Sequence, residues 1–272
     1  MPDEQSRELS VRRIAPRKGR MDNDRFQLAL RSDRRALDPD WDAHVRWWRG
    51  VIGRGRTGAP FPTLALSYYR SPGGSPGGRR IQSFSMVSSD TLTDEAVSAA
   101  IQSLDDPRRA DVLARGFGGK PAAHGFPFRF ELLVLDPMMR VLMSPYGGVS
   151  LPVSLSDATW ENFDPRAICI SWLTALGISE PIDPRWVKLP CMTHDLSDGV
   201  WRLLCLVDLR DSGLGVTAED IRDVLVGPDR GFDVAPATRH AMRGIMSQAA
   251  DSPSGAARVT SETILAYLSD SS

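Results

Sequence analysis

The sequence predicts an α+β fold, with an antiparallel sheet in the N-terminal half, helices packed on it, a helical C-terminal part and a basic, extended N-terminal arm. Segments that alternate between apolar and polar residues cluster before residue 155, and segments of helical period dominate the last part of the chain. Strict strand–helix–strand alternation is absent, so neither a dinucleotide-binding fold nor an α/β barrel is expected. With 272 residues, 42% of them hydrophobic, the chain can bury a core without disulfides or metal.

Three parts are expected along the chain. The basic arm spans 1–40, a single α+β body spans 41–250 with a possible subdivision near residue 157, and a helical tail spans 251–272. Apolar residues are sparse in the arm, where a short helix over 24–37 is indicated. Part of the arm is therefore expected to be flexible or to be ordered by a neighbouring molecule.

In the first half of the body, the apolar spacing predicts helices and strands separated by turn residues. The expected helices cover 41–53, 94–104 and 107–115, and the expected strands cover 62–70, 80–87, 126–135, 138–143 and 149–155. A tandem Ser-Pro-Gly-Gly repeat at 71–78 predicts an exposed hairpin loop. Thr93 is expected to be the N-cap of the second helix, and Asp136-Pro137 is expected to be a turn between paired strands.

In the second half, helix signals are stronger than strand signals. Asp164 followed by Pro165 predicts a helix that ends at Gly177. One apolar strand is expected at 200–209. Thr217 and Asp220 have the spacing of a capping box, and two further helices are expected over 236–249 and 260–268.

The net charge of −1 conceals a separation of charge along the chain. Residues 1–80 hold 17 basic and 9 acidic residues, whereas residues 81–272 hold 16 basic and 25 acidic residues. Thirty of the 33 basic residues are arginine, whose planar guanidinium pairs well with phosphate. A biased base composition of the gene explains an excess of arginine but not its separation from the acids. An anionic partner for the N-terminal part is therefore expected.

No Asp or Glu occurs from Ala43 through Ser89, a window that contains seven arginines interleaved with Trp and Tyr. Such a window attracts phosphate, and its aromatic rings offer stacking to unpaired bases. The alternative is that the aromatic residues are core and the arginines a solvated face. Together with the arm, the window gives the candidate RNA-binding residues, which are Arg12, Arg13, Arg17, Lys18, Arg20, Arg46, Trp47, Arg49, Arg54, Arg56, Arg70, Arg79 and Arg80.

Enzyme signatures are mostly missing. The glycine spacing at 53–58 follows a helix and precedes a strand, which is the wrong context for a nucleotide-binding loop. An alternative enzyme site lies around Cys191, His194 and Asp195 or around His124, where Cys191 and His194 have the spacing of two zinc ligands. No catalytic residue, metal or cofactor is expected.

The chain carries no signal peptide and no membrane-spanning segment by our expectation, because it lacks a sufficiently long apolar run. The three cysteines, which are odd in number and far apart, are expected to be buried thiols in a reducing compartment.

Pro, Ala and Ser together make up about a quarter of the chain, with 20 prolines, 25 alanines and 27 serines. With the length, the basic N-terminal part and the missing enzyme motifs, this composition resembles the proline-alanine-serine-rich proteins of polymycoviruses, which are fungal viruses with segmented double-stranded RNA. The resemblance covers the whole length and is compositional, so no residue role is transferred by motif.

The resemblance implies a coat protein that covers genomic double-stranded RNA without sequence specificity and self-assembles, in some members into filaments. It implies RNA and further copies of the chain as partners, and the virion and host cytoplasm as location. The arm of one subunit could dock on the acidic body of the next. Two alternatives remain: an enzyme with the site described above, and an adaptor that binds an acidic protein through its basic arm.

Overall fold

The computed structural model describes eleven ranges and two single residues. These are 11–15, 26–35, 37–52, 54, 62–70, 82–115, 125–143, 149–151, 164–175, 178, 181–226, 233–249 and 256–270, where 54 and 178 stand alone. The expected mixture of helices and strands is confirmed within this part of the chain.

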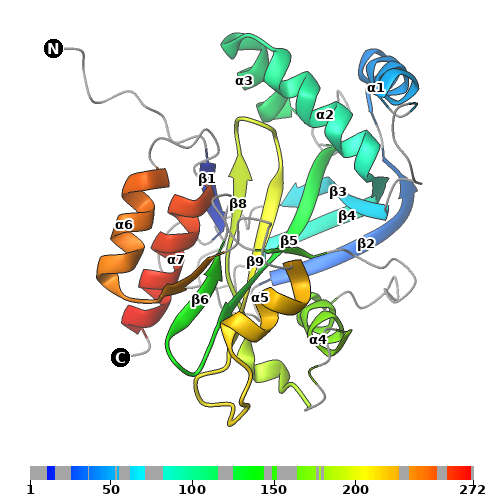
Figure 1. Cartoon of the computed structure of the whole chain (residues 1–272). Helices are drawn as coiled ribbons and strands as arrows, with labels where there is room; N and C mark the ends of the chain where they lie inside the picture. The colour runs from blue at the N-terminus through cyan, green and yellow to red at the C-terminus, as the bar shows by residue number, and fades with distance from the viewer. Residues whose placement is uncertain are drawn as a thin grey trace, which may run out of the picture.

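Ten strands of the described chain form one sheet, seen at the centre of Figure 1. Seven of them lie in the order β1-β8-β9-β5-β3-β4-β2, while β6 and β7 pair with β5, and β10 pairs with β6. The strands are β1 Val11–Ala15, β2 Phe26–Arg34, β3 Pro62–Arg70, β4 Gln82–Asp90, β5 Phe126–Leu135, β6 Arg140–Met143, β7 Val149–Leu151, β8 Val187–Asp195, β9 Trp201–Asp208 and β10 Asp233–Pro236.

The sheet is mixed, which corrects the expected antiparallel sheet. β2 runs parallel to β4, and β5 runs parallel to β9. The antiparallel expectation came from local hairpin signals, such as the turn at Asp136 that does join β5 to β6. Parallel neighbours are instead joined by long crossovers, which leave no local signal in the sequence. The nearly continuous burial of β5 and β9 is typical of strands covered on both faces.

The sheet also extends into the chain after residue 155, where a single strand was expected. β8 was missed because Pro190 interrupts its pattern and argues against a strand. The register between β8 and β9 shifts between Lys188 and Cys191, and this irregularity accommodates the proline. β10 was likewise missed, because its four residues precede a helix directly.

Two segments of the expected arm are strands, so the expectation of an extended arm is corrected for its described residues. β1 pairs with β8 and β2 pairs with β4, which places them at opposite ends of the seven-strand path. The helix expected over 24–37 is wrong. Phe26, Leu28 and Leu30 alternate along β2 with a period of two residues, and Leu30 is buried in the core.

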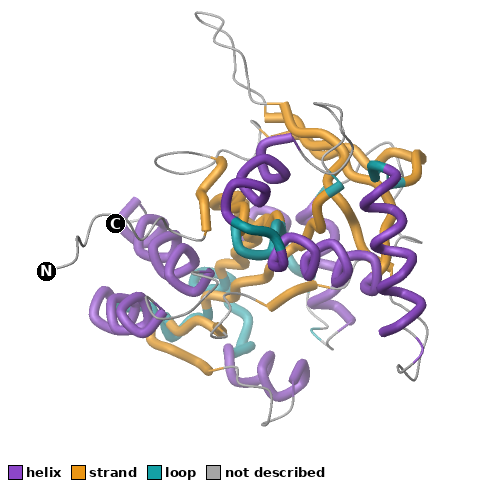
Figure 2. The backbone as a smooth tube through the Cα atoms, turned by 90° about the horizontal axis from the view of Figure 1, so that it is seen from above, coloured by secondary structure: helices purple, strands orange, loops and turns teal. Residues whose placement is uncertain are grey.

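Helices cover both faces of the sheet (Figures 1 and 2). Alternate residues of β5 enter two cores, with Phe130 in the larger one and Leu133 in the smaller. Helices α1 to α5 pack on the larger core, whereas α6 and α7 cover the opposite face. The helices are α1 Pro39–Ile52, α2 Thr91–Ser103, α3 Asp106–Arg115, α4 Pro165–Ala175, α5 Ala218–Val226, α6 Arg239–Ala249 and α7 Ala256–Asp270.

Helix α7 lies within the segment expected as a C-terminal tail. Its residues Val259, Ile264 and Tyr267 are buried, the last two in the smaller core. Thr263 Oγ1 lies 3.3 Å from the Sγ atom of Cys191 on β8. Helix α7 therefore packs against β8 on the face of the sheet that carries the smaller core.

Two of the predicted helix starts are confirmed and one is wrong. The backbone N–H of Arg166 donates to Asp164 at 3.0 Å, and the Asp220 N–H donates to the Thr217 hydroxyl at 3.2 Å. Helix α2 is capped by Asp90 rather than by Thr93, whose own N–H donates to the Asp90 carboxylate at 2.9 Å. Both residues are cap formers, and the sequence alone does not rank two of them three residues apart.

Candidate nucleic-acid interface

Helix α1 is held on the larger core by one face. Val45 is 4% exposed, and the partly buried rings of Trp41 and Trp48 pack against the same core. Asp38 precedes the helix, and its carboxylate accepts the N–H of Asp40 at 3.0 Å. The apolar spacing at 41, 45 and 48 therefore forms the buried stripe that the sequence predicted.

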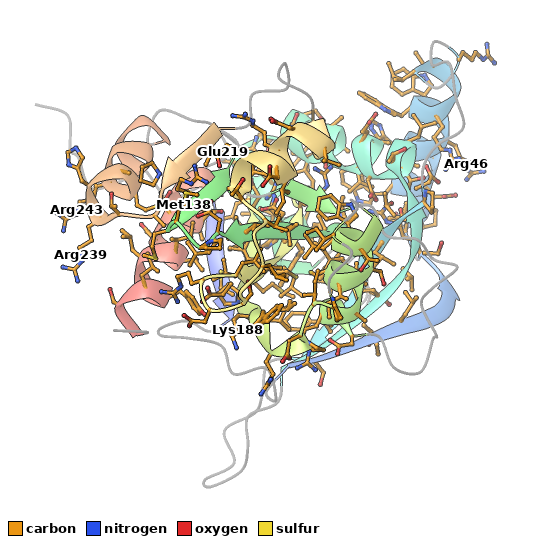
Figure 3. The ribbon with its side chains drawn as sticks, turned by 60° about the horizontal axis from the view of Figure 1, so that its bottom comes forward. Arg46, Met138, Lys188, Glu219, Arg239 and Arg243 are labelled. Carbon is orange, nitrogen blue, oxygen red and sulfur yellow. The ribbon has the colours of Figure 1, made fainter. Side chains whose placement is uncertain are left out.

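The opposite face of α1 and the residue beyond its end are open to solvent. This face consists of exposed residues at a spacing of three and four, which are Ala43, Arg46, Trp47, Gly50, Val51 and Arg54. Arg49 and Ile52 of the same helix are exposed as well. Trp47 is 60% exposed and Val51 is 52% exposed, which is unusual for apolar side chains of this size. Figure 3 shows Arg46 pointing outward at the periphery of the molecule. Cations and an aromatic ring thus share one exposed helix face.

The two arginines of this face are available to a phosphate. Arg46 pairs with Asp42 at 2.8 Å, but both side chains are largely exposed. Such a pair contributes about 0–1 kcal/mol, so a phosphate can compete for the guanidinium. Arg54 makes no ion pair with any residue that the structure describes.

Arg49, which was predicted to bind RNA, points toward α2 instead. Its guanidinium donates to the carboxylate of Asp90 at 2.5 Å and to the hydroxyl of Thr93 at 2.7 Å. Burial alone would raise the pKa of Asp90, but hydrogen bonds from Thr93 and Arg49 outweigh it and hold that pKa below its usual value. Arg49 thus ties α1 to the start of α2.

Three of the other predicted RNA-binding residues, Arg12, Arg13 and Arg70, lie in the described part of the chain. Arg12 and Arg13 lie in β1 opposite His194 and Thr193, at the end of the strand path that is remote from α1 and β2. Arg70 is the last residue of β3. The remaining candidates lie outside the described residues, as does the loop 71–78; they are Arg17, Lys18, Arg20, Arg56, Arg79 and Arg80. Among the described candidates, Arg12 and Arg13 therefore lie away from α1.

The alternative enzyme site is not assembled on β8. Cys191 packs in the smaller core beside α7, whereas the His194 ring stacks on Trp201 with centroids 4.6 Å apart, and Trp201 belongs to the larger core. The Cys191 thiol and the His194 imidazole thus lie on opposite faces of the sheet. Asp195 instead accepts hydrogen bonds from Ser197 and Arg202. His124 lies outside the described residues.

Two arginines that the sequence did not single out are buried in ion pairs. Arg35 donates to Asp94 at 2.8 Å, and their side chains are only 6% and 4% exposed. Burial lowers the pKa of Arg35 and raises the pKa of Asp94, although each charge counteracts the shift of the other. The only signal in the sequence is the double arginine at 34–35, which lies in the segment predicted as a basic arm.

Arg202 on β9 is the centre of a second buried cluster. It contacts Glu131 at 2.9 Å, Asp195 at 3.1 Å and Asp198 at 3.2 Å. Burial alone would lower the pKa of Arg202, but the three carboxylates raise it above its usual value. Burial and the nearby Asp198 raise the pKa of Asp195. One cation therefore faces three acids inside the sheet.

No protein-family model matches the chain, and no curated protein matches it significantly. Among the described residues, no group of three or more His, Cys, Asp and Glu side chains is arranged to hold a metal ion. No helix in the same part of the chain has the length and apolar character needed to cross a membrane.

Proposed function

We propose that the chain is an RNA-binding coat protein, a structural protein rather than an enzyme, of the kind that the polymycovirus resemblance implies. The observation that carries the proposal is the exposed face of α1, where Arg46, Trp47 and Arg54 stand together in a window free of acids. Guanidinium groups contact phosphates without reading sequence, and the Trp47 ring can stack on a base. Such a protein would act in the virion and the host cytoplasm.

Replacing both exposed arginines of this face tests the proposal. We expect R46E/R54E to bind oligouridylate and double-stranded RNA more weakly, and to lower the slope of log affinity against log salt by about two, since each lost phosphate contact removes about one. Fluorescence anisotropy over a salt series measures both quantities. The matched control is R108E/R185E, which makes the same charge change at two exposed arginines elsewhere.

The outcome that would overturn the proposal is wild-type affinity and salt slope for R46E/R54E. A second variant, W47A, separates stacking from charge. It should weaken binding of single strands by about 1–3 kcal/mol and leave an abasic oligomer of equal length unaffected, because only stacking requires a base.

Self-association is the second part of the proposal, and β1 is the segment that would provide it. β1 lies at an end of the strand path, and its backbone pairs with β8, with Arg12 opposite His194 and Arg13 opposite Thr193. The same strand pairing between two copies would link them head to tail.

Cysteine pairing tests whether β1 is exchanged between copies. Arg13 lies opposite Thr193, and cross-strand neighbours are within reach of a disulfide. We expect co-refolded R13C and T193C chains to give a disulfide-linked dimer on a non-reducing gel, with each variant alone as the control. If only the double variant R13C/T193C reacts, and does so within its own chain, the exchange is excluded.

A further inference from the structure

Helix α6 carries a second basic surface, on the half of the chain that is acidic overall. Arg239, His240 and Arg243 are exposed on its outer side, while Met242 is buried in the smaller core. The sequence from 234 through 250 contains no Asp or Glu. Arg239 has no ion-pair partner in the part of the chain that the structure describes. Helix α6 itself therefore carries basic side chains and no acidic one.

An exposed methionine turn lies next to the start of α6. The backbone N–H of Ala237 donates to the carbonyl of Met139 at 2.7 Å, which joins the turn between β5 and β6 to the residue before the helix. Met138 is 64% exposed and Met139 is 37% exposed. Polarizable thioethers at a surface adapt to flat apolar partners such as nucleobases and aromatic rings.

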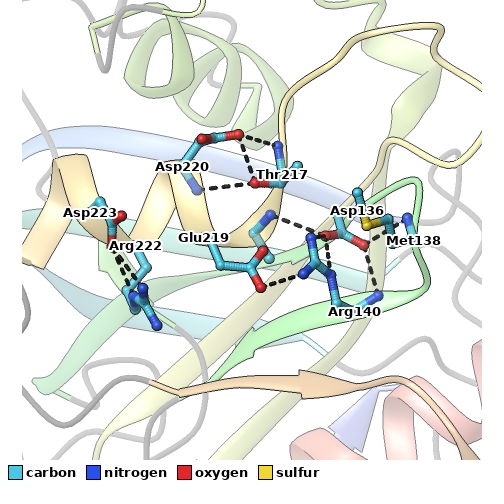
Figure 4. A network of polar contacts seen from close by, with 9 residues as sticks. Asp136, Met138, Arg140, Thr217, Glu219, Asp220, Arg222 and Asp223 are labelled. Atoms are coloured by element: carbon cyan, nitrogen blue, oxygen red, sulfur yellow. Dashed lines mark hydrogen bonds and ion pairs between the residues drawn. The ribbon is translucent and has the colours of Figure 1, made fainter.

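The turn is held in this shape by its own hydrogen bonds. The buried Asp136 carboxylate accepts the N–H of Met138 at 2.9 Å and the N–H of Arg140 at 2.8 Å, as Figure 4 shows. Met139 adopts a φ of 59°, a left-handed conformation that is rare for a residue other than glycine. Asp136 also accepts the N–H of Ala218 at 3.2 Å, which anchors the turn to α5. These hydrogen bonds thus fix the backbone of the turn that carries the two methionines.

The surface of α6 and that of α1 lie far apart. Figure 3 shows Arg46 on one side of the molecule and Met138, Arg239 and Arg243 on the other. This separation follows from the packing, because α1 rests on the larger core and α6 rests on the smaller core across the sheet. One strand of nucleic acid bound at α1 therefore leaves α6 free for another.

We infer that α6 and the adjoining methionine turn form a second polyanion-binding site, which takes RNA phosphates on Arg239 and Arg243 and bases on the methionines. With α1, this site makes each chain bivalent, so that one chain bridges two RNA segments. The bridging rests on the proposed function of α1, whereas the α6 site does not. Bivalent contacts draw separate segments together, because the second contact forms at a high effective concentration.

The experiment counts short oligouridylates bound per full-length chain by isothermal titration at low salt. We expect two for wild type, one for R239E/R243E, one for R46E/R54E and none for the quadruple variant. The control R108E/R185E should still bind two. Fluorescence cross-correlation of two oligonucleotides with different dyes should show that they diffuse together in the presence of wild type or of R108E/R185E. The other variants should show no joint diffusion.

The outcomes distinguish the two sites. One oligonucleotide per wild-type chain, lost in R46E/R54E and kept in R239E/R243E, would overturn the α6 site and leave the α1 proposal standing. If wild type binds one oligonucleotide and only R239E/R243E loses it, the α1 proposal and the bridging are overturned and the α6 site is supported. Unchanged RNA stoichiometry in R239E/R243E, together with binding of an acidic peptide that this variant loses, would mean that α6 recognises a protein and would overturn the inference.

Discussion

The variant R202A should lose about 3–5 kcal/mol of unfolding free energy, the cost typical of removing one partner from a buried ion pair. Arg202 is 8% exposed and is the cation that Glu131, Asp195 and Asp198 share. Without it, two nearly fully buried carboxylates remain close together with less compensation. Protonation of Asp195 would make the loss smaller at acid pH, since burial already raises the pKa of this carboxyl.

Urea denaturation followed by tryptophan fluorescence measures this loss. The control is R185A, which removes an exposed arginine from its pair with Asp183 and should leave the midpoint unchanged. Equal midpoints for R202A and R185A would show that the cluster does not stabilise the sheet.

The variant R35A should be destabilised by a similar amount, about 3–5 kcal/mol, for a related reason. Arg35 connects three elements, since its guanidinium donates to Asp94 of α2, to Ser89 of β4 and to the carbonyl of Gly125 before β5. Its loss leaves the nearly buried Asp94 without its cation, and leaves the Gly125 carbonyl without this donor. Thermal unfolding monitored by circular dichroism gives the comparison with the exposed control R108A.

A double variant shows whether the stability lost in R35A comes from the broken ion pair or from a packing defect. R35M/D94L removes both charges, so it should recover much of the stability lost in R35A, because two apolar side chains carry no desolvation cost. If R35M/D94L is less stable than R35A by the full cost of a second independent substitution, the two side chains are not coupled.

Elements with a strong local signal were predictable from the sequence. The strand over 62–70 and the hairpin around Asp136 follow from alternation and a turn dipeptide, and the helix starts at Asp164 and Thr217 follow from capping side chains. Strand partners were not predictable, because β1 pairs with β8 and β2 with β4 across long stretches of chain. The strands of the arm were therefore not predicted, because their partner strands lie far away in the sequence.

The candidate interface was predictable in part. The acid-free window identified Arg46 and Trp47, which are exposed. It also included Arg49, whose side chain is 40% exposed but which lies four residues after the buried Val45, on the side of the helix that borders α2. This spacing could have separated Arg49 from Arg46. The basic side of α6 was not predicted, because its short acid-free stretch lies within residues 81–272, which are acidic overall.

The pairing of β1 with β8 also sets the order in which the sheet is completed. Val11 lies opposite Asp195, so the first strand of the chain has no partner until most of the chain has been synthesised. At roughly 5–20 residues per second, this wait lasts on the order of ten seconds or more. Contacts between such distant segments also form slowly once both are present, because a long loop must close. Closure of this edge is thus a late step, set by the synthesis of β8 rather than by the arm itself.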